Sequence, residues 1–155
     1  MARWLSIDHG RRRIGVAVGS TDDGVVSPLA VLPAEPAGKV PEAISALVEK
    51  YGVKGVVVGW PLNMDDTEGP QALQAREFAK QLIRTTGLDV RLWDERLSSF
   101  AADQVLAGAM TRKKKKARQD AVAAAAILED FIRRDGPASA VRPDQTGPLP
   151  PPKAD

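Results

Sequence analysis

The stretch RWLSIDHGRRRIGVAV, residues 3–18, consists of two apolar segments joined by a charged turn. Residues 3–7 and 14–18 are rich in apolar residues, as strands are, and the turn at residues 10–12 is short enough to pair them as a hairpin. Asp8 stands where the first strand ends. The stretch therefore predicts that a sheet begins with a hairpin and that a carboxylate lies at the end of its first strand.

Three further strands are expected beyond this hairpin. They occupy residues 25–32, 53–58 and 88–93. Pro28 lies within the first of them and indicates an edge strand or a bulge, because proline cannot donate a hydrogen bond to a neighbouring strand. The second is a nearly continuous apolar run, which is typical of a buried central strand. A loop is expected after it, at residues 59–69.

Helices separate these strands. Apolar residues recur at helical spacing in residues 40–51, 70–86 and 120–134, and Ser98 or Ser99 is expected to cap one more helix. Gly52 and Gly87 are expected to end the first two helices. Three strands followed by alternating helices and strands predict an α/β fold, a five-stranded mixed sheet flanked by helices.

The composition limits the chemistry of the chain. Its 155 residues, 43% of them apolar, fit one domain. The absence of cysteine excludes thiol nucleophiles, disulfides and thiolate metal sites, and a single histidine argues against zinc. That histidine, His9, should point to the opposite side of the strand from Asp8, so we expect no catalytic role for it. Carboxylates remain, and they select hard cations such as Mg²⁺ and Mn²⁺.

Three carboxylates stand at the ends of predicted elements. Asp8 and Glu95 follow apolar strands, and Asp120 begins a helix in line with its apolar face. Each has an ordinary structural explanation, in a turn, a surface ion pair and a helix N-terminus respectively. Singly, these explanations are favoured. Together, in a chain without other metal ligands, the three suit phosphodiester hydrolysis with two divalent ions that hold the attacking water and the leaving oxygen.

Basic residues are clustered although the net charge is only +2. Six cations fall within residues 112–118, and such a run can neutralise several phosphates or form a solvated surface loop. Arg13 can bind a phosphate or pair with a carboxylate. Trp60 can stack on a base or fill the core. The expected nucleic-acid contacts are Arg13, Arg96, Arg112, Lys113, Lys114, Lys115, Lys116 and Arg118.

Four segments resemble the motifs of the YqgF family. They are DHGRRRIGVA at residues 8–17, VGWPLNMDDTEG at 58–69, DERLSS at 94–99 and DAVAAAAIL at 120–128. The four occur in the order that the family has, with the basic run ahead of the last, and the match covers about residues 3–134. Asp66 stands where the family often has glycine, and Trp60 stands where an aliphatic residue is commoner.

The resemblance implies an RNase H-like fold and a metal-dependent nuclease. It assigns Asp8, Glu95 and Asp120 as catalytic residues that bind Mg²⁺ or Mn²⁺, with two ions expected. It also implies a role either in maturing the 5′ end of pre-16S rRNA or in resolving Holliday junctions. The partners would be structured RNA in pre-ribosomal particles, or branched DNA. An rRNA nuclease can be a monomer, whereas symmetric cutting of a junction favours a homodimer.

Two other classes of protein stay open. One is a nucleic-acid-binding or ribosome-assembly factor without catalysis. The other is an actin-like phosphotransferase, which needs two such domains and is disfavoured by the length of the chain.

The boundaries of the domain are expected from composition. Residues 1–135 are expected to form the RNase H-like nuclease domain, and residues 136–155, which are rich in proline, a disordered tail. No signal-peptide pattern precedes Asp8, and no segment is long and apolar enough to span a bilayer. We therefore expect a cytoplasmic protein that does not bind membranes.

Overall fold

The computed structural model describes residues 2–95, 112–134, 136 and 140–141. Its strands are β1 (Arg3–His9), β2 (Arg13–Ser20), β3 (Val26–Pro33), β4 (Gly55–Trp60) and β5 (Asp89–Asp94). Its helices are the short 3₁₀ helix η1 (Ala37–Lys39), α1 (Val40–Tyr51), α2 (Pro70–Thr86) and α4 (Arg112–Arg133). None of the helices within these ranges has the length and apolar character that a membrane span needs.

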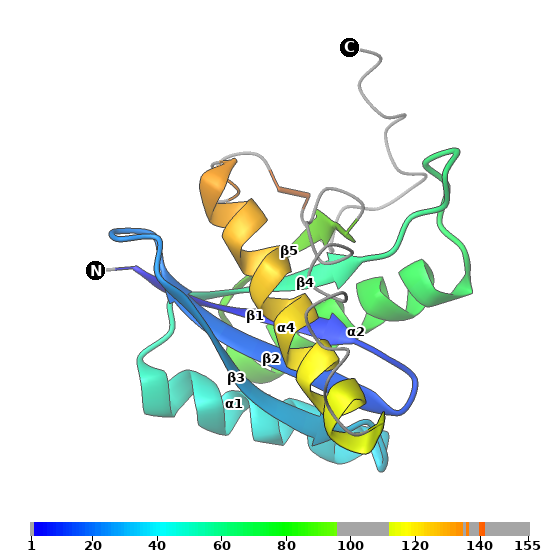
Figure 1. The fold of residues 1–155 in the computed structure, drawn as a ribbon, viewed down its shortest axis with the longest axis horizontal. Helices are drawn as coiled ribbons and strands as arrows, with labels where there is room; N and C mark the ends of the chain where they lie inside the picture. Colours follow the sequence, from blue (N-terminus) through cyan, green and yellow to red (C-terminus); the bar gives the residue numbers. More distant parts are fainter. Residues whose placement is uncertain (1, 96–111, 135, 137–139, 142–155) are drawn as a thin grey trace.

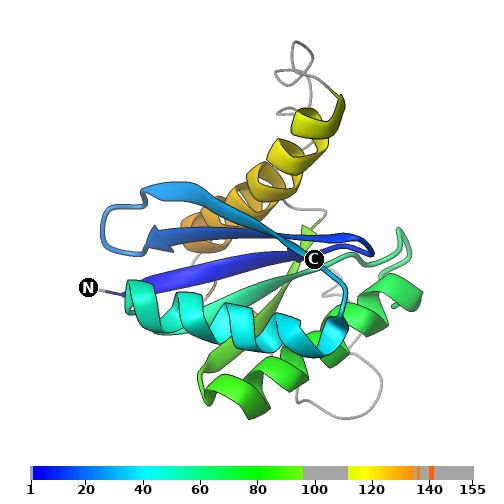
Figure 2. The ribbon, with the colours of Figure 1, turned by 90° about the horizontal axis from the view of Figure 1, so that it is seen from below.

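The strands form one five-stranded mixed sheet in the order β3-β2-β1-β4-β5, which confirms the predicted architecture. The pairs β1–β2 and β2–β3 are antiparallel, whereas β4 is parallel to both β1 and β5. Pro28 lies in the edge strand β3, and the register shifts beside its partner Ala17, so both expectations for this proline are confirmed. Helix α4 crosses one face of the sheet, and α1 and α2 cover the other (Figures 1 and 2).

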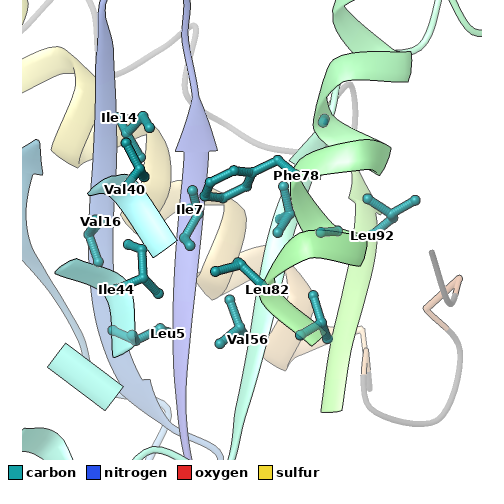
Figure 3. Packing of buried hydrophobic residues seen from close by; sticks show 14 of the residues in the cluster. Leu5, Ile7, Ile14, Val16, Val40, Ile44, Val56, Phe78, Leu82 and Leu92 are labelled. Atoms are coloured by element: carbon teal, nitrogen blue, oxygen red, sulfur yellow. The ribbon is translucent and has the colours of Figure 1, made fainter. Parts of the chain in front are cut away.

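The two faces have separate apolar cores because side chains alternate along each strand. On β1, Leu5 and Ile7 pack into the larger core under α1 and α2, where Phe78 of α2 extends toward Ile7 (Figure 3). Trp4 faces α4 and packs against Phe131. On the same face as Trp4, the Ser6 hydroxyl donates to the Ala124 carbonyl oxygen, which connects the middle of β1 to α4.

Among the boundaries that differ from the predictions, two bear on the site. Strand β4 continues to Trp60, whereas a loop was expected from residue 59, because Gly59 and Trp60 still pair with Trp93 and Asp94 of β5. Helix α4 begins at Arg112 instead of residue 120. The basic run is therefore helical and not a loop. Lysine and arginine are good helix formers, so a run of them can extend the helix that follows.

Part of the expected tail lies against the sheet. The Leu92 N–H donates to the Val141 carbonyl oxygen at 2.8 Å, and these two residues form an antiparallel bridge at the outer edge of β5. Val141 also packs against the larger core. The domain boundary at residue 135 stays a prediction. Residues 142–155 and the helix expected after Ser98 or Ser99 lie outside the described residues.

Candidate active site

The fold brings Asp8 and Glu95 together. Strands β1, β4 and β5 are parallel, so their carboxyl ends meet at one edge of the sheet. Asp8 lies near the end of β1, and Glu95 directly follows β5. The two side chains are hydrogen-bonded to each other, although strand β4 lies between their strands. Two of the three predicted carboxylates are therefore neighbours.

Gly59 of β4 provides the space for this contact. It lies one position beyond the last registered pair of β1 and β4, Ile7 with Val58, and is therefore level with Asp8. A Cβ added to Gly59 would lie 2.5 Å from Glu95 Oε1, 2.7 Å from Ile127 Cδ1 and 3.0 Å from Glu95 Cγ. The Glu95 side chain thus crosses β4 at the point where β4 has no side chain. Sequence reasoning missed this role, although glycine within a buried strand signals a close approach.

The environment of Glu95 favours its neutral form. Burial first, then the charge and hydrogen bond of Asp8, and then the charge of Asp94 raise the pKa of Glu95 to about 9. Two carboxylates at such close range need either a shared proton or a cation between them. Their oxygens are ligands that Mg²⁺ and Mn²⁺ prefer. The residues present therefore fit a divalent cation.

Asp120 lies in α4, and its side chain lies outside the part that the structure describes. The course of the helix is fixed by two contacts, since Phe131 packs on Trp4 and Ala124 accepts from Ser6. Helix α4 therefore runs antiparallel to β1, so residues nearer the start of α4 lie nearer the end of β1. One further turn back reaches Asp120, in the direction of Asp8. Within residues 2–95 and 121–134 no group of three or more potential metal ligands occurs, so a third ligand from α4 stays a prediction.

The structure describes only some of the residues that are predicted to contact phosphates. Arg13 begins β2, two residues before Gly15, which pairs with Asp8. Arg13 and Asp8 therefore share the α4 face of the sheet. Arg96 lies outside the described residues. The run from Arg112 to Arg118 forms the first turns of α4, and the positions of its side chains are not described.

Trp60 does not offer its ring to a base. Its side chain is 4% exposed, and its indole N–H donates to Glu68 at 2.9 Å. Glu68 also accepts from Arg76 Nε at 3.0 Å, and the Arg76 guanidinium lies 5.5 Å from the centre of the Trp60 ring. The stacking role considered for Trp60 is therefore wrong, and this residue anchors the loop that follows β4. In that loop Asp66 has a φ of 69°, which explains why glycine suits its position.

His9 occupies the opposite face, as predicted from strand alternation. Its ring centre lies 4.6 Å from that of Phe78 on α2, and burial lowers the pKa of the imidazole. His9 thus lies on the α2 side of the sheet, away from the carboxylates.

The chain is similar to known proteins over most of its length. The RuvX family, described as "Holliday junction resolvase", matches residues 2–134. A "Putative pre-16S rRNA nuclease" of Chloroflexus aurantiacus is 41% identical over 136 residues, which cover 86% of this chain and 89% of the relative. A protein of the same name from Ruegeria pomeroyi is 40% identical over 129 residues, covering 83% and 84% of the two chains.

The fold is also similar to that of RuvC. RuvC of T. thermophilus in complex with a Holliday junction substrate matches 92% of this chain and 99% of its own, with a TM-score of 0.57 and 15% identity. This likeness confirms the RNase H-like fold. The sequence matches identify the chemistry as that of a nuclease, a hydrolase of phosphodiesters. The chain belongs to the RuvX family, the one that its four YqgF-like motifs resemble.

Proposed function

We propose that this protein is a divalent-cation-dependent endonuclease that matures the 5′ end of pre-16S rRNA in the cytoplasm. The observation that carries the proposal is the hydrogen-bonded pair of Asp8 and Glu95 at the carboxyl edge of the sheet. The names of the relatives at about 40% identity favour the rRNA substrate.

The residues have distinct roles in this proposal. Asp8, Glu95 and Asp120 hold Mg²⁺ or Mn²⁺, with two ions expected. Cations bound there supply positive charge that neutralises the phosphodiester and activates water for in-line attack. Arg13, on the same face as Asp8, holds a phosphate of the substrate through its guanidinium. Electrostatic stabilisation of this kind is usually the largest contribution to phosphoryl-transfer catalysis.

The basic start of α4 serves as the backbone-binding surface. Figure 2 shows this end of the helix extending away from the sheet. Six cations in the first two turns can contact several phosphates, which makes binding dependent on salt. We expect Arg96, directly after Glu95, to contribute a further phosphate contact.

Resolution of Holliday junctions is the second candidate function. The description of the family and the RuvC-like fold favour it. A resolvase cuts two strands symmetrically, so this candidate requires a two-fold dimer, whereas the rRNA nuclease can act as a monomer.

One experiment separates these candidates. The purified protein is incubated with a 5′ fragment of pre-16S rRNA and, separately, with a four-way DNA junction, in Mg²⁺ and in Mn²⁺. Asp8→Asn, Glu95→Gln and Asp120→Asn are tested beside Glu42→Gln, which alters an exposed carboxylate on α1. Cleavage of the RNA alone that is lost in the three variants and kept in the control supports the proposal.

Three other outcomes would contradict it. Symmetric cutting of the junction alone, with the same dependence on the carboxylates, establishes the resolvase. Full cation-dependent cleavage by Asp8→Asn, in protein free of contaminating nuclease, refutes the assigned chemistry. The absence of any cleavage that depends on these residues supports a binding or assembly factor.

A further inference from the structure

A pocket of about 520 Å³ lies on the face of the sheet opposite the carboxylates. His9 of β1 and Ile14 of β2 line its sheet side, Val40 lines it at the start of α1, and Phe78 lines it from α2. Figure 3 shows Ile14 and Val40 on one side of β1 and Phe78 on the other. The volume lies within the range of small-molecule pockets, which is about 300 to 1,000 Å³.

The pocket combines the half-buried ring of His9 with polar groups. The rings of His9 and Phe78 lie 4.6 Å apart and are inclined by 30°. The exposed amides of Gln74 and Gln81 on α2 line the same space, and each carries both a donor and an acceptor.

The pocket lining carries one negative and one positive side chain, Glu77 and Arg84. Glu77 lies 3.5 Å from Lys80 in an ion pair, which offsets its negative charge. Arg84, one turn beyond Gln81, adds a positive charge to the lining. Aromatic rings suit the face of a base, amides suit its edge, and a guanidinium suits a phosphate.

The pocket and the carboxylate pair lie at the same end of β1. Asp8 and His9 are consecutive, so their Cα atoms are about 3.8 Å apart, with the side chains on opposite faces. The turn that joins β1 to β2 carries Arg11 and Arg12, both exposed, at this edge. A nucleic-acid strand that crosses the edge from one face to the other therefore meets guanidinium groups along its backbone.

We propose that this pocket binds an unpaired nucleotide of the substrate strand, next to the nucleotides at the scissile bond. The base stacks on the half-buried ring of His9, which packs against Phe78 of α2, and the flanking phosphates contact the arginines of the turn and Arg84. This assignment rests on the proposed nuclease function, because the strand must reach the carboxylate pair on the other face.

His9 provides a direct measurement, because it is the only histidine of the chain. Its imidazole proton resonances are followed by NMR while a short single-stranded RNA, AMP or inorganic phosphate is added to the full chain in EDTA. Without divalent cations no cleavage occurs, so binding is measured apart from catalysis. Stacking of a base predicts an upfield shift with RNA, a weak or absent shift with AMP, and none with phosphate.

Two variants locate the effect. Gln81→Trp fills the pocket, and Gln71→Trp places the same side chain at an exposed position of α2 that does not line it. The RNA-induced shift is expected to vanish in Gln81→Trp and to remain in Gln71→Trp. RNA binding should weaken about tenfold in Gln81→Trp alone, which corresponds to the loss of one stacked base. Circular dichroism checks that both variants are folded.

Several results would overturn the assignment. These are an unshifted His9 in wild-type protein saturated with RNA, a shift that survives in Gln81→Trp, or RNA that does not bind. A shift produced by AMP but not by RNA would instead indicate a site for free nucleotides. If the proposed nuclease function is wrong but the pocket assignment is right, the RNA-induced shift of His9 would persist while cleavage in Mg²⁺ is absent.

Discussion

Replacing Gly59 with alanine tests whether the missing side chain creates the carboxylate site. The new Cβ would lie 2.5 Å from Glu95 Oε1, whereas ordinary van der Waals contact begins near 3.4 Å. The Glu95 carboxyl group must therefore move by about 0.9 Å, the difference between these distances. The new Cβ cannot move away from Glu95 instead, because it would also lie 2.7 Å from Ile127 Cδ1 in the core under α4.

The expected loss of activity follows from that displacement. A catalytic group misplaced by about 1 Å can lower the rate about 100-fold. Overpacking against Ile127 should lower the free energy of unfolding by about 1–3 kcal/mol. Gly59→Ala is therefore expected to fold and to cleave about 100-fold more slowly than wild type in saturating Mg²⁺.

The matched control is Gly55→Ala on the same strand and the same face. A Cβ there would lie 2.6 Å from the Trp4 ring, so it should destabilise the fold to a similar extent. Gly55 is four residues before Gly59, at the far end of β4 from the carboxylates. Single-turnover cleavage rates and thermal unfolding are measured for both variants. Wild-type cleavage by folded Gly59→Ala, or an equal loss in Gly55→Ala, would refute the reasoning.

Three further predictions concern charge. Burial and the neighbouring carboxylates raise the pKa of Glu95 to about 9 from its ordinary value of 4.5, so cation-free protein should lose stability as the pH rises from 4.5 to 9. Glu95→Gln should show a smaller loss of stability between pH 5 and pH 8 in thermal unfolding with EDTA. An equal loss in the variant and the wild type would contradict this prediction. Arg76→Met leaves the largely buried Glu68 carboxylate without its ion pair, so the free energy of unfolding should fall by about 3 kcal/mol in chemical denaturation. The control Arg84→Met alters an exposed arginine, and its free energy of unfolding should fall by less than about 1 kcal/mol. Equal losses in the two variants would argue against a buried ion pair. Replacing the four lysines at residues 113–116 with serine should reduce the slope of log K against log salt for single-stranded RNA by about 3, and an unchanged slope would remove this run from the binding surface.

Much of the fold could be predicted because its signals are local. The end of α1 at Gly52 and that of α2 at Gly87 follow from glycines with φ of 63° and 69°, which other residues adopt reluctantly. The edge position of Pro28 follows from its missing N–H. These features need no knowledge of distant parts of the chain.

The end of β4 and the start of α4 depended on other information. Trp60 remains in the strand because it pairs with Asp94, more than thirty residues away. Its indole N–H finds Glu68, and Glu68 finds Arg76 on α2. A tryptophan beside a glycine and a proline suggests a loop when only its neighbours in sequence are considered, and the pairing partner decides otherwise.

The proximity of Asp8 and Glu95 followed from the parallel strands, but the space around them did not. Asp8 pairs with Gly15 on one side and is level with Gly59 on the other. Residues directly opposite on neighbouring strands share a face of the sheet. Asp8 therefore stands on the α4 face between two positions without side chains. Only the register aligns these glycines, because they come from different motifs of the sequence.

This arrangement gives the glycines a part in the chemistry that the carboxylates alone do not explain. A larger side chain at Gly59 would displace Glu95, which reaches Asp8 there. A side chain at Gly15 would lie on the same face as Asp8, because these two residues pair. Cations and a phosphodiester need room on that face as well as oxygen ligands. Acidic residues at strand ends indicate where ligands could bind, and Gly59 leaves the room in which the Glu95 side chain reaches Asp8.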